Sequence, residues 1–75
     1  MAVARVIEVS ATSDQGFEAA VQEGINRANK TLRNVTSAWV KDLRVNLDNG
    51  RVRDYQVNLL ITFILDDSNE EMTGR

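Results

Sequence analysis

The 75-residue chain contains no cysteine and no histidine, and its aromatic residues amount to one Trp, one Tyr and two Phe. Disulfide frameworks, thiolate zinc sites, cysteine nucleophiles and histidine-based catalytic relays are therefore excluded. No stretch approaches the roughly 18 apolar residues that a transmembrane helix requires, and the first residues lack the basic region and apolar core of a secretory signal. We expect a non-enzymatic, cytoplasmic protein that does not enter a membrane.

The charge is close to balanced, with nine Lys and Arg against eleven Asp and Glu. Four of the acids lie within the last ten residues, so the remainder offers no basic field for nucleic acid. We expect a folded domain over residues 1–67 and an acidic, mobile tail over residues 68–75. A domain this small buries only about 60% of its unfolded surface, so self-association is expected to complete its core.

The residue pattern in the first half of the chain predicts a strand followed by a helix. Short, β-branched residues at positions 3–10 are typical of a strand. An apolar stripe from Phe17 to Leu32 at helical spacing predicts an amphipathic helix, with Ser13 as its N-cap and Gly16 inside it. Gly24 lies within the stripe, which indicates a close approach between helix and sheet.

The second half has a period of two. A strand is expected over residues 35–47, and its apolar residues change face near Lys41 and Asp42, which predicts a β-bulge there. Asp48-Asn49-Gly50 predicts a tight hairpin turn, followed by a third strand over residues 51–65.

These elements define an α+β protomer of order β-α-β-β, in which an antiparallel three-stranded sheet of order 1-3-2 wraps on one helix. A fifteen-residue strand spans roughly 50 Å and a twenty-residue helix only about 30 Å. The hairpin should therefore extend beyond the helix. Its uncovered apolar residues, among them Leu60, Ile64 and Trp39 or Leu43, are expected to meet other copies of the chain.

Several segments keep their order with almost no gaps: Val6-Ile7-Glu8-Val9, Phe17-Glu18-Ala19-Ala20-Val21, Lys30-Thr31-Leu32-Arg33, Val40-Lys41-Asp42-Leu43-Arg44 and Asp54-Tyr55-Gln56-Val57. In these segments, and over residues 5–67 as a whole, the chain resembles the dodecins. These are small flavin-binding proteins whose β-α-β-β protomers assemble into a hollow dodecamer. The resemblance implies a homododecamer that stores or sequesters a flavin, riboflavin or FMN, at its subunit interfaces.

The resemblance also implies residue roles. Gln56 matches the family's glutamine that hydrogen-bonds the flavin ring. The position of the family's stacking tryptophan is occupied by Ser37, and Trp39 follows two residues later. Because side chains alternate along a strand, Trp39 should share the face of Ser37 at a displacement of about 6 to 7 Å. Trp39 therefore either takes over the stacking of a planar ligand or serves as a subunit contact.

A second departure concerns phosphate. Dodecins that bind phosphorylated flavin or coenzyme A often carry a basic residue where this chain has Ile64. Arg44, Lys41 or a residue at a helix end remain as candidate phosphate ligands. For Arg44 and Lys41, salt bridges between subunits to Asp42, Asp54 or Glu8 are the alternative. A structural oligomer without flavin, binding calcium through these carboxylates or binding coenzyme A, is the alternative function.

Overall fold

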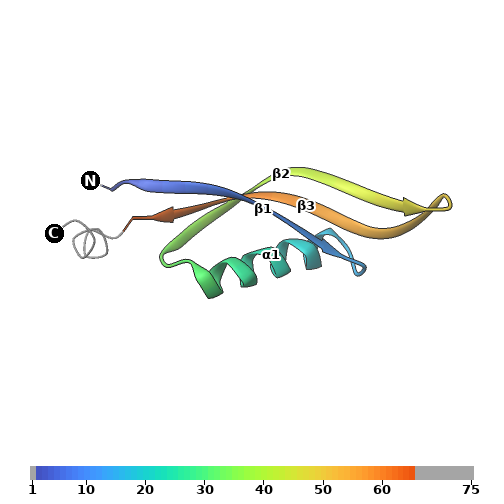
Figure 1. The fold of residues 1–75 in the computed structure, drawn as a ribbon, viewed down its shortest axis with the longest axis horizontal. Helices are drawn as coiled ribbons and strands as arrows, with labels where there is room; N and C mark the ends of the chain where they lie inside the picture. Colours follow the sequence, from blue (N-terminus) through green and yellow to red (C-terminus); the bar gives the residue numbers. More distant parts are fainter. Residues whose placement is uncertain (1, 66–75) are drawn as a thin grey trace.

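The computed structural model describes residues 2–65 and contains one helix and three strands (Figure 1). In chain order these are β1 (Ala4–Ser13), α1 (Phe17–Thr31), β2 (Val35–Asp48) and β3 (Arg51–Ile64). β3 lies between β1 and β2 and pairs with each of them in the antiparallel sense. The predicted element order and the predicted strand order are thus confirmed. The tail that the sequence predicts at residues 68–75 lies outside the described residues.

The core lies between α1 and the central strand. Val57, Leu59 and Ile61 of β3 are fully buried against Ala20 and Ala28 of α1, because every second side chain of the strand points towards the helix. Only these three large side chains are completely buried within residues 2–65. A single copy of the chain therefore has a small core.

Gly24 allows α1 to lie this close to the sheet. A Cβ atom at position 24 would lie 2.8 Å from Leu59 Cδ1 and 3.3 Å from the Cβ atom of Ala11. The first distance is shorter than any ordinary contact between carbon atoms. The close approach that the sequence predicts is confirmed, and its physical reason is the absence of a side chain at this position.

The bulge predicted in β2 is also present. Val40 pairs with Leu59 and Asp42 pairs with Asn58, so Lys41 is the extra residue. Because of this insertion, Val40 before the bulge and Leu43 after it both lie on the α1 side of the sheet, opposite Leu59 and Val57. The sequence did not predict two further register shifts, at Thr36 in β2 and at Arg53 in β3.

The prediction for the start of the helix was wrong. Ser13 is the last residue of β1, where it pairs with Tyr55, and its Oγ accepts a hydrogen bond of 3.0 Å from the backbone N–H of Gln15. The helix begins at Phe17, and Gly16 precedes it with a φ angle of 146°. The strand continues because residues 11–13 still find partners on β3, and Gly16 then supplies a backbone conformation that L residues rarely adopt.

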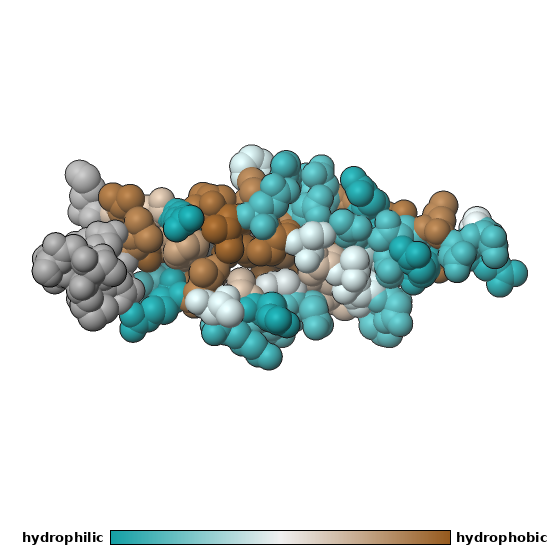
Figure 2. Space-filling view, viewed as in Figure 1, coloured by the Kyte–Doolittle hydropathy of each residue, from teal (hydrophilic) through white to brown (hydrophobic). Residues whose placement is uncertain are grey.

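The hairpin turn is confirmed by left-handed backbone angles, with φ of 54° at Asn49 and 77° at Gly50. The β2–β3 hairpin, which has this turn at its tip, extends past the start of α1 (Figure 1). Apolar surface covers the end of the molecule where β1 begins and reappears near the hairpin tip (Figure 2). Leu43, Leu47 and Val52 remain 52–59% exposed.

Candidate ligand-binding face

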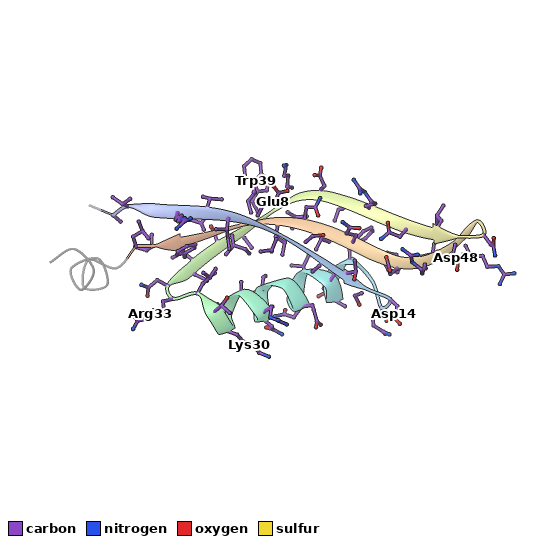
Figure 3. All side chains as sticks on the ribbon, in the orientation of Figure 1. Glu8, Asp14, Lys30, Arg33, Trp39 and Asp48 are labelled. Atoms are coloured by element: carbon purple, nitrogen blue, oxygen red, sulfur yellow. The ribbon has the colours of Figure 1, made fainter. Side chains whose placement is uncertain are left out.

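We call the face of the sheet that points away from α1 the outer face. Trp39 of β2 lies on it, directly opposite Leu60 of β3, whose other neighbour is Glu8 of β1. Figure 3 shows Trp39 pointing away from the helix, close to Glu8. Trp39 is 69% exposed. A single copy therefore presents the flat surface of this ring to its surroundings.

Ser37 lies on the same face as Trp39, opposite Thr62, at the next outer-face position along β2. Thr62 in turn pairs with Val6 of β1, which is 52% exposed. The structure thus agrees with the expected common orientation of Ser37 and Trp39. On the neighbouring strands, Leu60 and Val6 give the outer face an apolar part beside Trp39, next to the polar side chains of Ser37, Thr62 and Glu8.

Lys41, the extra residue of the bulge, forms an ion pair across the sheet within one chain. Its Nζ lies 3.4 Å from Glu8 Oε2, and both side chains are 48% exposed. Exposed ion pairs contribute only about 0 to 1 kcal/mol to stability. The pair nevertheless occupies the Lys41 ammonium, which the sequence proposed as a phosphate ligand.

Gln56 lies in a second, polar part of the outer face, closer to the hairpin. Asn46 Nδ2 donates hydrogen bonds to Asp54 Oδ1 at 2.6 Å and to Gln56 Oε1 at 3.2 Å. Gln56 Nε2 donates to Ser10 Oγ at 3.0 Å. These four residues form a continuous hydrogen-bonded row across all three strands, which we call the polar row.

Arg44 lies directly opposite Gln56 in the β2–β3 register. Within residues 2–65 the Arg44 guanidinium forms no ion pair. Of the two basic side chains that were proposed from the sequence for phosphate binding, Arg44 is therefore the one that no carboxylate of residues 2–65 pairs with.

The five candidate residues fall into two groups on one face. Trp39 pairs with Leu60, and Gln56 lies four residues earlier on the same strand, so the two positions are about 13 Å apart along the sheet. Ser37 and Lys41 belong to the Trp39 group, and Arg44 belongs to the Gln56 group. One protomer therefore does not bring all five side chains together.

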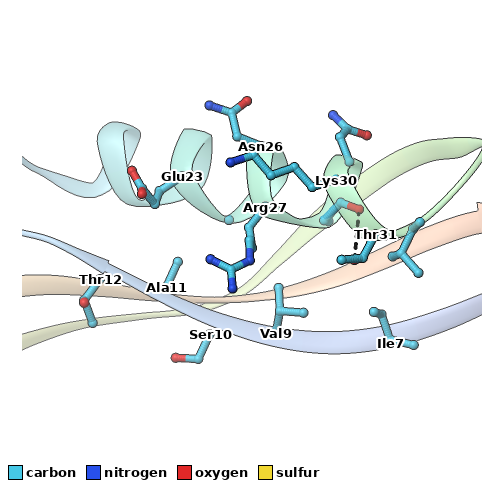
Figure 4. Close-up of a pocket in the computed structure, with 14 residues that line it drawn as sticks. Ile7, Val9, Ser10, Ala11, Thr12, Glu23, Asn26, Arg27, Lys30 and Thr31 are labelled. Atoms are coloured by element: carbon cyan, nitrogen blue, oxygen red, sulfur yellow. Dashed lines mark hydrogen bonds between the residues drawn. The ribbon is translucent and has the colours of Figure 1, made fainter.

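A cavity of about 650 Å³ lies elsewhere, between α1 and the edge strand β1. Ile7 and Val9 of β1 line it opposite Arg27 and Lys30 of α1, and Arg27 reaches from the helix towards the strand (Figure 4). None of the five candidate residues lines this cavity. The side chains proposed from sequence for ligand binding thus lie on the open outer face and outside this cavity.

From the sequence, Asp54 was considered only as a charged partner or calcium ligand, and the roles of Asn46 and Ser10 in the polar row were not predicted. Asp54 and Gln56 share a face by simple alternation, which the sequence could have indicated. Asn46 reaches Asp54 only because of the register shift at Arg53, which has no clear sequence signal.

Within the described residues 2–65, no three Asp or Glu side chains gather into a possible metal site. No helix in that range is long and apolar enough to cross a membrane.

Comparisons with known proteins agree with this architecture. The model of the Dodecin family matches residues 3–66. The chain is 38% identical to the dodecin of Thermus thermophilus over 66 residues, which cover 88% of this chain and 96% of that protein.

Two solved structures illustrate the range of relatives. The dodecin from Streptomyces davaonensis superimposes with a TM-score of 0.82 at 35% identity, covering 87% of this chain and 96% of that one. The calcium dodecin from Mycobacterium tuberculosis, a calcium-chelating antigen, gives a TM-score of 0.76 at 27% identity, covering 88% and 94%.

The fold and the exposed outer face define a small α+β protomer of the kind that assembles with copies of itself. The chain belongs to the dodecin family, whose members are small, oligomeric, non-enzymatic flavin-binding proteins.

Proposed function

We propose that the chain forms a homododecamer that stores or sequesters a flavin, riboflavin or FMN, or a related planar ligand, where copies of the chain meet. Family membership supports both flavin binding and assembly. The observation that carries the proposal is the exposure of Trp39, a residue that is 69% accessible on the outer face beside Leu60. A monomeric protein seldom leaves an apolar surface such as that of Trp39 and Leu60 uncovered.

Trp39 takes the stacking role in this proposal. Ser37 has no flat surface to offer, whereas Trp39 lies on the same face at the neighbouring pair. Offset stacking between aromatic rings contributes about 0.5 to 1.5 kcal/mol beyond the burial of surface. The pocket is therefore displaced along β2 towards Leu60, relative to the position that the family pattern indicates.

Gln56 supplies the polar contact to the edge of the ring. Because it lies about 13 Å from Trp39 along the sheet, a ring that contacts both side chains is held more simply by residues from two copies. Arg44, opposite Gln56 and without an ion pair in residues 2–65, then binds the phosphate when the ligand is FMN. Lys41 contributes less, since it is paired with Glu8.

Fluorescence titration tests this function. Riboflavin emission is followed while purified protein is added, and native mass spectrometry of the same sample gives the size of the assembly and the number of bound ligands. Strong quenching with a defined number of flavins per assembly is the expected result. Emission that stays constant at a large excess of protein would refute flavin binding.

A structural oligomer that binds calcium or coenzyme A is the second candidate. It is favoured by Ser37 and Ile64, where the family pattern has a tryptophan and a basic residue, and by the likeness to the calcium dodecin of Mycobacterium tuberculosis. Because no three acidic side chains gather within residues 2–65 of one copy, such a calcium site would combine carboxylates from several copies. Calorimetry with Ca²⁺ on chelator-treated protein, showing binding in the absence of flavin quenching, would support this function.

A further inference from the structure

The polar row of the outer face fixes which way the Gln56 amide points. We propose that Asp54, acting through Asn46, sets this orientation, so that Gln56 offers a ligand one acceptor and one donor in a fixed order. This inference rests on the proposed function, because it names the chemical class of ring that the same face selects. Asp54 and Asn46 are positioning residues in this scheme, since their effect on the ligand passes through Gln56.

The order of donors and acceptors along the polar row follows from the carboxylate of Asp54, which lies at one end of it. An ionised carboxylate can only accept hydrogen bonds, so the atom of Asn46 that lies 2.6 Å from Asp54 Oδ1 must be the donor Nδ2. The same Nδ2 lies 3.2 Å from Gln56, and the atom facing it must therefore be the acceptor Oε1. Gln56 Nε2 is left on the other side, where it donates to Ser10 Oγ.

The strand register and an ion pair hold this arrangement in place. Asn46 pairs directly with Asp54 because of the register shift at Arg53. Arg53 Nε in addition lies 3.4 Å from the second carboxylate oxygen, Asp54 Oδ2. Both oxygens of the Asp54 side chain thus have a partner, and the carboxylate is held at the end of the row.

The Gln56 amide keeps spare capacity after these bonds. Its Oε1 has two lone pairs and Nε2 has two hydrogens, and the row uses one of each. One acceptor and one donor therefore remain, side by side, for a ligand. They match an imide edge, in which a ring N–H is flanked by carbonyl groups: Oε1 accepts from the N–H and Nε2 donates to a carbonyl.

Rings that lack the N–H lose half of this match, so the row selects for imide-bearing rings such as the pyrimidine part of a flavin. If Asp54 becomes Asn, the amide oxygen stays beside the donor Arg53 Nε, so the amide nitrogen faces Asn46 and the reversed orientation of Asn46 and Gln56 becomes the favoured one. The productive orientation is no longer favoured. The cost is that of about one hydrogen bond, which corresponds to a loss of affinity of about threefold to tenfold.

The test compares Asp54→Asn with the wild-type chain, using riboflavin and its N3-methyl derivative as probes. Riboflavin carries no charge, so removal of the carboxylate charge does not by itself alter its binding. Asp48→Asn is the matched control, because it removes an equivalent charge at the hairpin, away from the polar row. Native mass spectrometry of every variant confirms that the assembly is intact.

We expect Asp54→Asn to bind riboflavin about threefold to tenfold more weakly, while the N3-methyl derivative changes by less than twofold, so that discrimination between the two rings falls. Asp48→Asn should leave both affinities as they are in the wild type. Equal loss for both ligands would indicate a merely structural effect and would overturn the inference, as would discrimination that does not change.

A measurement without ligand separates this inference from the proposed function. In protein labelled with ¹⁵N in its glutamine side chains, nuclear Overhauser contacts from the Gln56 amide protons should reach Ser10 and not Asn46 in the wild type. In Asp54→Asn, where the orientation is reversed, they should reach Asn46 and not Ser10. Contacts to both residues in the wild type would refute the fixed orientation, whatever the flavin result, whereas a wild type that ignores riboflavin would refute the proposed function.

Discussion

Trp39 lies directly opposite Leu60 in the β2–β3 register, on the sheet face that α1 does not cover. On the other face, Leu43 and Leu47 of β2 are 59% and 58% exposed. Burial of one such side chain contributes about 1.5 to 3 kcal/mol. Because the two uncovered apolar regions lie on opposite faces, a single two-fold contact cannot cover both, and assembly beyond a dimer follows naturally.

Removal of the Trp39 ring should abolish most of the flavin affinity. We expect Trp39→Ala to bind riboflavin at least tenfold more weakly, because stacking and burial are lost together. Fluorescence quenching measures the affinity, and Ser37→Ala on the same face is the control, with an expected change of less than twofold. If Trp39→Ala in an intact assembly binds as well as the wild type, Trp39 is a subunit contact and not a ligand contact.

Replacement of Ser37 by tryptophan places an aromatic ring at the position that the resemblance to the dodecins assigns to the stacking tryptophan. Ser37 and Trp39 share the outer face, so Ser37→Trp should strengthen riboflavin binding by about tenfold through additional stacking. The same titration measures it. An intact oligomer with unchanged or weaker binding would show that the pocket differs from the family arrangement in more than one residue.

Arg44 should distinguish phosphorylated from unphosphorylated flavin. We expect Arg44→Ala to bind FMN about threefold to tenfold more weakly and riboflavin within twofold of the wild type, because only FMN carries the phosphate. The loss should shrink at high salt, as charge interactions are screened. Arg51→Ala, at the hairpin end, is the matched control. Parallel losses for both flavins would contradict a phosphate-binding role.

The apolar residues of β2 should matter for assembly more than for the fold of the protomer. Leu43→Asp alters a side chain that is already 59% exposed in one copy, so far-UV circular dichroism should retain the signal of the sheet and helix. Size-exclusion chromatography should nevertheless show smaller species, because a charge cannot be buried in an apolar contact. Asn49→Asp at the turn adds the same charge as a control. A full-sized Leu43→Asp assembly would exclude this residue from the interfaces.

Gly24 should tolerate no larger residue without cost. Gly24→Ala gains about 1 kcal/mol of helix propensity, but its Cβ would lie 2.8 Å from Leu59 Cδ1, and overpacking costs about 1 to 3 kcal/mol. Since Leu59 is fully buried, we expect a net loss of about 1 kcal/mol in chemical denaturation. Gln22→Ala on the exposed helix face serves as the control. In a double-mutant cycle, Leu59→Val should reduce the cost of Gly24→Ala, and strict additivity would argue against the contact.

The sequence predicted those features that repeat along the chain or that have a local signature. The change of face in β2 revealed the bulge at Lys41, and Asn49-Gly50 revealed the turn. The start of α1 could not be read in the same way, because residues 11–13 remain in β1 through pairing with β3, which is a long-range interaction. Ser13 has the chemistry of a helix cap but is used at a strand end.

The candidate face was predictable in part for a related reason. Alternation placed Ser37 and Trp39 on one face correctly. The polar row was not foreseen, since Asn46 meets Asp54 only through a register shift at Arg53. Nor could the sequence show that the five candidate side chains separate into two groups, because that separation depends on the pairing of β2 with β3.

The most direct test of the account is the mass of the native particle in dilute neutral buffer, measured by sedimentation equilibrium with and without riboflavin. One copy has a mass of 8.4 kDa. We predict a closed particle of many copies, near twelve times this mass, that binds riboflavin in a fixed ratio. A stable particle of 8.4 kDa would contradict it, because the uncovered apolar faces and the shared ligand site both require neighbouring copies.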